Sequence, residues 1–326
     1  MAKRIIVFFI IFALAFSLNG CAEENISHEK NGLNIVATVF PAYDFAREIA
    51  GEHANVTLLI PPGTEIHGFE PTPQDVIRIR ECDLLICNGG ESEAWLEEIL
   101  SGIDSDIPTV RMMDCVETVE EETKEGMQSA GHAHSKQDEE NTLSSDKKNE
   151  QEYDEHVWSS PANALLICNK ICSAICTADK DNAVFYTNNC SEYVSKLSEL
   201  DGRIREIVDN ASCKIMIFAD RFPVRYFVEE YGLDYYAAFP GCAEDTEPSA
   251  KTVAFLIDRV REYNIPAVFY IEFSNEKMAD IICEDTGCKK LIFHSCQNIG
   301  ADKFESGVTY LELMCENAEN LREALG

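Results

Sequence analysis

Strands and helices alternate along most of this chain, and the alternation restricts it to folds built on parallel β-sheets. Two neighbouring parallel strands need a crossover between them, usually a helix, and the crossovers cover the faces of the sheet. The sequence therefore predicts an α/β protein. The β-rich runs, each followed by a helical stretch, occupy residues 34–39, 56–60, 83–87, 215–218, 234–239, 267–271 and 291–293.

A long helical segment separates the two sets of runs. It starts near Pro161, a residue that suits the first turn of a helix. From Tyr193 to Ile207 the apolar residues recur at spacings of 4, 3, 4 and 3, as on one face of an amphipathic helix. With 326 residues the chain is long enough for two cores. We expect an N-terminal lobe at 33–160, a linking helix at 161–210 and a C-terminal lobe at 211–326.

The charge of the chain excludes one class of partner. There are 27 Lys and Arg against 58 Asp and Glu, a net charge of −31. Nucleic-acid binding needs a cationic surface, so we do not expect it. Residues 117–155 are rich in Glu, Asp, Lys, Gln, Ser and Asn and have almost no large apolar residue, which predicts a mobile, acidic loop. Its His132 and His134 could catch a metal ion transiently, and the loop could equally be a dispensable linker.

The N-terminus has the form of an export signal. Lys3 and Arg4 precede a short apolar run, 5–16, which is too short for a membrane-spanning helix. The next residues, Leu18-Asn19-Gly20-Cys21, resemble a bacterial lipobox. We expect a signal peptide at 1–20, a lipid on Cys21 and a tether at 21–32; the alternative is a plain secretory signal. No later stretch of the sequence is predicted to span a bilayer.

Fourteen cysteines do not form the tight CxxC pairs of a structural zinc module. Cys168, Cys172 and Cys176 recur every four residues, on one stripe of a helix, where thiols pack as small apolar groups. A thiolate site is the alternative. Cys283 and Cys288 could form a disulfide, and their spacing leaves this open.

Three of the seven histidines follow or approach the ends of predicted strands or ordered segments. His67 follows the second strand, His156 lies where the chain regains order after the acidic loop, and His294 follows the last strand. In open α/β sheets, ligands bind at the carboxyl ends of the strands. Imidazoles together with a carboxylate suit a first-row divalent cation. The other four, His28, His53, His132 and His134, need little functional explanation.

Two motifs make this pattern specific. Residues 61–73 resemble the P-x-G-x-x-x-H-x-x-x-P-T-P element of the metal-binding lipoproteins that serve ABC importers of zinc or manganese, the zinc-transporter-A-like cluster A-I solute-binding proteins. Residues 154–158 are similar to their D-x-H-x-W motif. The resemblance covers nearly the whole mature chain. It implies two pseudo-symmetric α/β lobes, a rigid linking helix and a metal ion between the lobes.

The resemblance also implies a ligand set, from which this chain departs twice. His67 and His156 match the first two ligands of the family. The third is normally a His after the strand at 215–218, and the chain instead carries Asp220 nearby. The fourth is normally an Asp, and here it is His294. We expect His67, His156, His294 and Asp220 to bind the metal. Glu272 competes for the carboxylate role, and Arg221 could pair with one of these acids.

Three imidazoles and one carboxylate favour Zn²⁺ over Mn²⁺, which prefers more oxygen ligands; Fe²⁺ is a further alternative. Imidazoles bind metal when neutral, so affinity should fall as the pH drops through about 6.5.

The function that these features favour is a non-catalytic, monomeric solute-binding lipoprotein. It would capture Zn²⁺ outside the bacterial membrane and deliver it to an ABC importer permease. One alternative is a zinc hydrolase with Glu65 or Glu272 as general base, although the sequence has no H-E-x-x-H helix. Another is a surface adhesin that the metal stabilises. The absence of a G-x-x-x-x-G-K-[ST] element assigns ATP hydrolysis to a separate chain.

Overall fold

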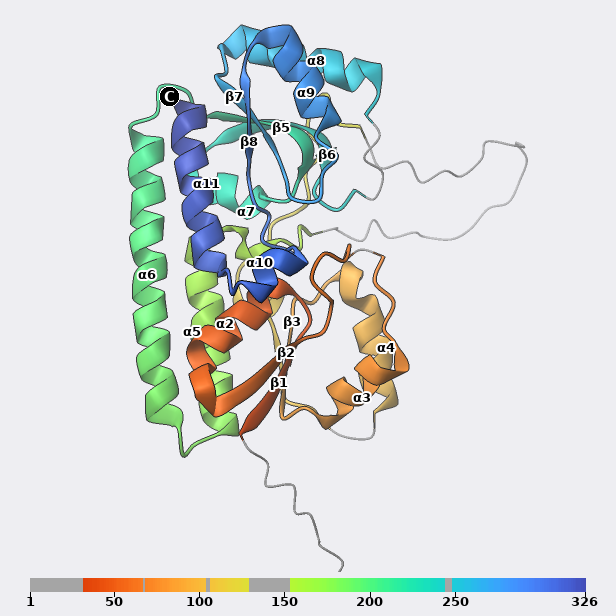
Figure 1. Ribbon diagram of the computed structural model, residues 1–326, viewed down its shortest axis with the longest axis vertical. Helices are drawn as coiled ribbons and strands as arrows, with labels where there is room; N and C mark the ends of the chain where they lie inside the picture. Colours follow the sequence, from red (N-terminus) through yellow and green to blue (C-terminus); the bar gives the residue numbers. More distant parts are fainter. Residues whose placement is uncertain (1–31, 67, 104–105, 129–152, 244–247) are drawn as a thin grey trace, which may run out of the picture. The chain divides into compact units, whose positions relative to one another are not determined.

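The computed structural model describes residues 32–66, 68–103, 106–128, 153–243 and 248–326 (Figure 1). Residues 33–326 form one compact unit with two parallel four-stranded sheets. The strands are β1 (Leu33–Ala37), β2 (Ala54–Leu58), β3 (Leu84–Cys87), β4 (Thr109–Arg111), β5 (Ile215–Phe222), β6 (Asp234–Pro240), β7 (Ala267–Tyr270) and β8 (Lys289–Ile292).

The two sheets have the same topology. The N-terminal sheet has the order β2-β1-β3-β4 and the C-terminal sheet the order β6-β5-β7-β8, and all pairings between neighbouring strands are parallel. In each sheet the second strand lies on one side of the first strand, and the third strand lies on its other side. The strand order therefore changes direction between β1 and β3 and between β5 and β7. The predicted α/β fold with two pseudo-symmetric lobes is confirmed. The short strand β4 was not predicted, because three residues give too little pattern.

Helices cover the sheets and join the lobes. The helices within the described residues are α2 (Phe40–Ala50), α3 (Pro73–Glu81), α4 (Ala94–Gly102), α5 (Pro161–Ala178), α6 (Ala183–Asp209), α7 (Arg225–Tyr231), α8 (Ala250–Tyr263), α9 (Lys277–Thr286), α10 (Ala301–Glu305) and α11 (Tyr310–Leu325). Single 3₁₀ turns lie at η1 (Gly51–His53), η2 (Glu91–Glu93), η3 (Met113–Cys115) and η4 (Val157–Ser159).

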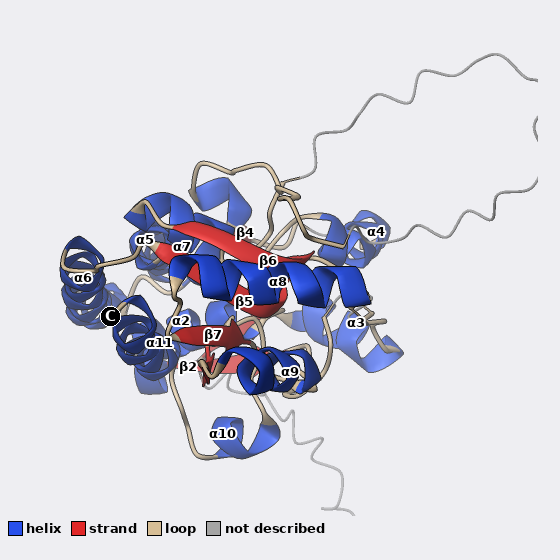
Figure 2. Ribbon diagram, turned by 90° about the horizontal axis from the view of Figure 1, so that it is seen from above, coloured by secondary structure: helices blue, strands red, loops and turns tan. Residues whose placement is uncertain are grey.

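The segment between the lobes consists of two helices, α5 and α6, which pack against each other. Helix α11 runs beside α6 (Figures 1 and 2). One buried cluster continues from Ile35 in β1 through Leu197 in α6 and Leu321 in α11 to Phe218 in β5. The helices thus connect the two sheets through a shared core, which favours a fixed arrangement of the lobes.

Helix α5 corrects the sequence-based expectation that no segment after the N-terminal signal is long and apolar enough to span a membrane. Within the described ranges it is the one helix that is long and apolar enough to cross a membrane by length and composition. Its face with Ile167, Ile171 and Ile175 is fully buried in the shared core. The helix also carries Cys168 and Cys172, both buried against α6. We therefore interpret α5 as a core helix.

The described cysteines are all free thiols. Cys172 lies near the carbonyl oxygen of Tyr186, and Cys190 near that of Cys168, with sulfur–oxygen distances of 3.8 Å each. These thiols fill the α5–α6 contact as small apolar side chains, which agrees with the packing interpretation. The Sγ atoms of Cys283 and Cys288 lie 3.6 Å apart, at the end of α9 and the start of β8.

The acidic segment differs from the prediction at its described ends. Residues 129–152, with His132 and His134, lie outside the described residues. Before them, the amide of Gln128 donates to the carbonyl of Ala238 in β6 at 2.8 Å, and Lys124 forms an ion pair with Asp234. After them, Tyr153 forms an antiparallel bridge with Glu120. The two ends are therefore ordered, because backbone pairing partners distant in sequence satisfy them.

Asp44 is a fully buried carboxylate at the junction of α2, α6 and α11. Its Oδ2 accepts a hydrogen bond from the first amide of α11, that of Tyr310, at 2.8 Å, and its Oδ1 accepts one from Arg47 at 2.6 Å. Burial raises the pKa of Asp44 to about 6, although Arg47 and the Tyr310 amide act in the opposite direction. The native protein therefore holds this proton at pH values where an unfolded aspartate has lost it.

Because the pKa of Asp44 is raised in the folded protein, we expect Asp44→Asn to change how the free energy of unfolding depends on pH. Between pH 4 and pH 6 the native carboxyl binds more protons than the unfolded one, so its contribution to the free energy of unfolding falls as the pH rises. A shift of about two pKa units corresponds to roughly 3 kcal/mol. Urea unfolding at pH 4.5 and 6.5 should show the variant gaining stability relative to the wild type at the higher pH. Parallel pH profiles for both proteins would contradict this assignment.

Candidate metal centre

His156 lies in a buried turn where the two lobes meet. Its side chain has no exposed surface, and its Nδ1 lies 3.2 Å from Oδ1 of Asp154, which also accepts the backbone amide of His156 at 2.8 Å. Burial by itself lowers the pKa of His156, but the charge and hydrogen bond of Asp154 and the charge of Glu155 outweigh it and raise the pKa. A neutral imidazole that donates from Nδ1 to this carboxylate presents Nε2 as its metal-binding nitrogen.

The N-terminal lobe fixes this turn through the loop after β3. The side chain of Asn88 donates to the carbonyl oxygen of Glu155 at 2.9 Å. The carboxylate of Glu155 accepts the amide of Ser92 at 3.0 Å and also its hydroxyl. Gly90 allows this close approach, because it has a φ of 108° and a Cβ there would lie 2.6 Å from Cδ of Glu155. The backbone before His156 is therefore held on the sheet of the N-terminal lobe.

The C-terminal lobe fixes the same turn from the other side. The hydroxyl of Tyr226 in α7 donates to the carbonyl of Asp154 at 2.7 Å, and the indole N–H of Trp158 donates to the carbonyl of Ser295 at 2.8 Å. Gly241 after β6 makes room for the imidazole, since a Cβ there would lie 3.2 Å from Cε1 of His156. Residues of both lobes thus set the position of His156.

The loop before His67 is held by the C-terminal lobe. His67 itself lies outside the described residues. The side chain of Asn298 donates to the carbonyl oxygens of Pro61 and Thr64, at 3.1 and 2.7 Å, and the amide of Gly63 donates to the carbonyl of Ile299 at 2.8 Å. The segment that leads into the first sequence motif is therefore attached to the loop after β8.

Next to this loop, Glu65 and Arg221 form an ion pair across the lobes. The two terminal guanidinium nitrogens of Arg221, Nη1 and Nη2, lie 3.4 Å from Oε1 and Oε2 of Glu65 respectively. The sequence left open whether Arg221 would pair with an acid, and the structure gives Glu65 as its partner. Because Glu65 is half exposed, the pair adds little stability, of the order of 1 kcal/mol or less.

Asp220 lies at the end of β5 and faces the C-terminal lobe. Its Oδ1 accepts the amide of Arg221 at 2.8 Å, and Oδ2 lies 3.5 Å from the amide of Ile271. Burial raises the pKa of Asp220, while hydrogen bonds from Ser274 and the Arg221 amide partly offset this effect. The carboxylate therefore connects β5 to the loop after β7.

His294 and Glu272, two of the candidate metal ligands, have different hydrogen-bond partners. The ring Nε2 of His294 lies 3.1 Å from Oε2 of Glu316 in α11 and 3.5 Å from Nζ of Lys303. Both oxygens of Glu272 accept from Ser295, one from its amide at 2.8 Å and one from its hydroxyl. Glu272 thus positions the residue after His294, whereas the imidazole of His294 faces α10 and α11.

Across the described ranges, no three His, Cys, Asp or Glu side chains are grouped so that they could hold a metal ion. His156, Asp220 and His294 are therefore not brought into one cluster, and the contribution of His67 falls outside the described residues. The described residues do bring together His156 and its carboxylate partner Asp154, and both lobes enclose this pair.

Several positioning residues were not found from the sequence. Asn88, Tyr226 and Asn298 hold the two motif segments, but each contacts the backbone of a residue at least 67 positions away. For Asp154 a signal existed, since a carboxylate two residues before a histidine can accept from its ring nitrogen.

Comparisons with known proteins show which family and which structures the chain is similar to. The family described as zinc-uptake complex component A, periplasmic, matches residues 35–324. The high-affinity zinc uptake system protein of Bacillus subtilis is 28% identical over 100% of this chain and 99% of its own length. The zinc-binding lipoprotein AdcA of Streptococcus pneumoniae is 27% identical over 95% of this chain, which spans 58% of that protein. The Zn(II)-bound domain of AdcA superposes with a TM-score of 0.72 at 25% identity, covering 90% of this chain and 99% of the domain.

Proposed function

Because the chain belongs to the zinc-uptake complex component A family of periplasmic proteins, we propose that it captures a divalent metal ion outside the cytoplasm and delivers it to the permease of an ABC importer. Zn²⁺ is the proposed cargo, with Mn²⁺ and Fe²⁺ as weaker competitors. The observation that carries this proposal is the buried His156, oriented by Asp154 and enclosed by both lobes. The family is one of transport proteins, and we propose no catalytic role for the chain.

His67 and His156 are the proposed principal ligands. Asn298 holds the segment that leads to His67, and Trp158 attaches the turn that carries His156 to Ser295. Both segments therefore lie against the loop 294–299 of the C-terminal lobe. The remaining donor is one of His294, Asp220 and Glu272. His294 could take part through Nδ1, because its contact with Glu316 uses Nε2. Asp220 and Glu272 would have to share oxygens that now accept backbone amides.

Metal capture would stabilise the arrangement of the lobes. An ion that binds the folded chain and not the unfolded one increases stability in proportion to the logarithm of its concentration over Kd. If ligands come from both lobes, the loaded form differs from the empty one at the lobe boundary, and a permease could distinguish the two. For export and attachment we propose a signal peptide at 1–20 and a lipid on Cys21, with the mature chain acting as a monomer.

The metal content of the purified protein tests this proposal. We expect native mass spectrometry to show one Zn²⁺ per chain after stripping with a chelator and reloading from equimolar Zn²⁺, Mn²⁺ and Fe²⁺. The double variant His67→Ala, His156→Ala should remain metal-free under the same conditions, because the two principal donors are gone. Equal metal content in the two proteins would remove the site assignment, and preferential loading with Mn²⁺ would replace the proposed cargo.

A further inference from the structure

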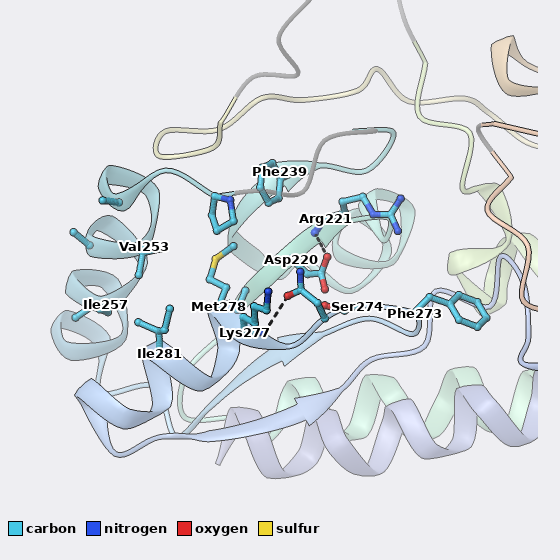
Figure 3. A pocket seen from close by; sticks show the side chains of 15 residues that line it. Asp220, Arg221, Phe239, Val253, Ile257, Phe273, Ser274, Lys277, Met278 and Ile281 are labelled. Carbon is cyan, nitrogen blue, oxygen red and sulfur yellow. Dashed lines mark hydrogen bonds between the residues drawn. The ribbon is translucent and has the colours of Figure 1, made fainter.

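A cavity lies in the C-terminal lobe, and the described residues that line it do not include His156. It has a volume of about 680 Å³ and lies between α8, α9 and the carboxyl ends of β5 and β6 (Figure 3). It also borders the loop after β7. The sheet changes direction between β5 and β7, and in α/β sheets the crevice at such a switch point is where ligands bind. The volume suits a small organic molecule.

The walls of this cavity divide into an apolar part and a polar part. Figure 3 shows Val253 and Ile257 on α8 opposite Ile281 on α9, and Asp220, Ser274 and Lys277 gathered at the other end. Ile281 is 48% exposed although it is a large apolar residue, so an occupant would remove apolar surface from water.

The polar end of the cavity offers a ligand one carboxylate, that of Asp220, and one ammonium group, that of Lys277. Arg221 lines the cavity too, but its guanidinium is paired with Glu65. Asp220 is buried and accepts from two amides and from Ser274, which leaves acceptor capacity on a carboxylate. Lys277, the first residue of α9, has no ion-pair partner within the described ranges. A ligand that satisfies both carries a positive and a negative group.

One residue that lines the cavity has a strained backbone. Phe273 has a φ of 63°, in the left-handed region that a bulky residue rarely adopts, and the residue is 53% exposed. It lines this cavity and also the small pocket beside Glu65 and Ile66 at the boundary between the lobes. Such strain is typically retained at binding sites.

We propose that this cavity binds an apolar α-amino acid as a zwitterion. The ammonium group lies against Asp220, the carboxylate against Lys277, and the side chain between Val253, Ile257 and Ile281. This site goes beyond metal transport. It uses neither His67 nor His156, and among the described candidate metal donors it shares only Asp220.

Calorimetric titration of the metal-free full chain with L-leucine and L-phenylalanine tests the proposal. We expect binding of at least one of them. 3-Phenylpropionate, which lacks the ammonium group, should bind at least about 10-fold more weakly, because the buried carboxylate of Asp220 is left without its partner. Phenethylamine, which lacks the carboxylate, should bind about 2- to 5-fold more weakly, because Lys277 is exposed and an exposed ion pair contributes little.

Three variants locate the site. Ile257→Trp, which fills the cavity, should abolish binding. Lys277→Gln should weaken it about 2- to 5-fold, because Lys277 is exposed. Lys251→Gln removes an exposed lysine of α8 that does not line the cavity and should change nothing. The proposal is overturned if neither amino acid binds, if 3-phenylpropionate binds as well as L-phenylalanine, or if Ile257→Trp binds normally. Repeating the titration with Zn²⁺ keeps the two ideas separate, since zinc loading that persists in Ile257→Trp leaves the transport function intact.

Discussion

Replacing His156 by alanine should weaken zinc binding by about 100-fold or more. The imidazole is completely buried, and the carboxylate of Asp154 holds its Nδ1 at 3.2 Å, so the ring is oriented before the metal arrives. Loss of a carboxylate that orients a ligand histidine typically costs about 10- to 100-fold in metal affinity. Loss of the imidazole itself should cost at least as much, because it removes a donor as well as its orientation. Competition with a chromophoric chelator at neutral pH measures the change.

Two further variants make this result specific. Asp154→Asn should lower the affinity by about 10- to 100-fold, because an amide positions the ring less well than a carboxylate. His53→Ala is the matched control, since His53 packs on Phe185 at a ring distance of 4.4 Å and belongs to no candidate site. Its affinity should equal that of the wild type. If His156→Ala bound zinc as tightly as His53→Ala, the buried turn would be a structural feature and not a metal centre.

Much of the fold could be predicted from the sequence because its signals are local. The alternation of strands and helices, the repeat from Tyr193 to Ile207 and the proline at 161 depend on residues a few positions apart. Both sheets, their parallel pairing and helices α5 and α6 correspond to these signals. The shared core could not be foreseen, since its contacts join residues of β1, α6, α11 and β5 that are far apart in the chain.

The candidate site was predictable as a set of motifs but not as a set of contacts. The two histidine motifs and the family follow from spacing and residue type. The partners of Asp220 and His294 do not, because each depends on an element that packing brings close: the amides of Arg221 and Ile271 for Asp220, and Glu316 in α11 for His294. A charge pattern indicates that donors exist, whereas the tertiary structure decides which of them a neighbouring group already uses.

The ordered ends of the acidic segment illustrate the same distinction. Composition alone predicts mobility for residues 117–155, since the segment has few large apolar side chains. In the structure the amide of Gln128 pairs with Ala238 of β6, and the amide of Asp154 donates to the carbonyl of Val119 at 2.9 Å. Backbone groups are available in every residue, so a polar segment can be ordered wherever a sheet edge offers partners.

Truncation of Trp158 to alanine should lower the free energy of unfolding by about 3–5 kcal/mol, the usual range for a large aromatic residue in a core. Only 1% of its surface is exposed, and it belongs to the core that both lobes share. Its indole N–H donates to Ser295 in the C-terminal lobe, and its carbonyl accepts the hydroxyl of Tyr310 at 2.7 Å. The residue therefore contributes packing and a hydrogen bond at the boundary between the lobes.

Trp158→Phe separates these two contributions. It keeps most of the ring and removes the donor, which leaves the carbonyl of Ser295 without its partner and should cost about 1–3 kcal/mol. Trp95→Ala is the control, because it truncates the second tryptophan of the chain on helix α4, which packs against Phe69 and is only partly buried. Its cost should be clearly smaller than that of Trp158→Ala. Urea unfolding of the three variants measures the changes in the free energy of unfolding. Equal losses for Trp158→Ala and Trp95→Ala would mean that a residue at the boundary between the lobes contributes no more stability than a partly buried residue of α4.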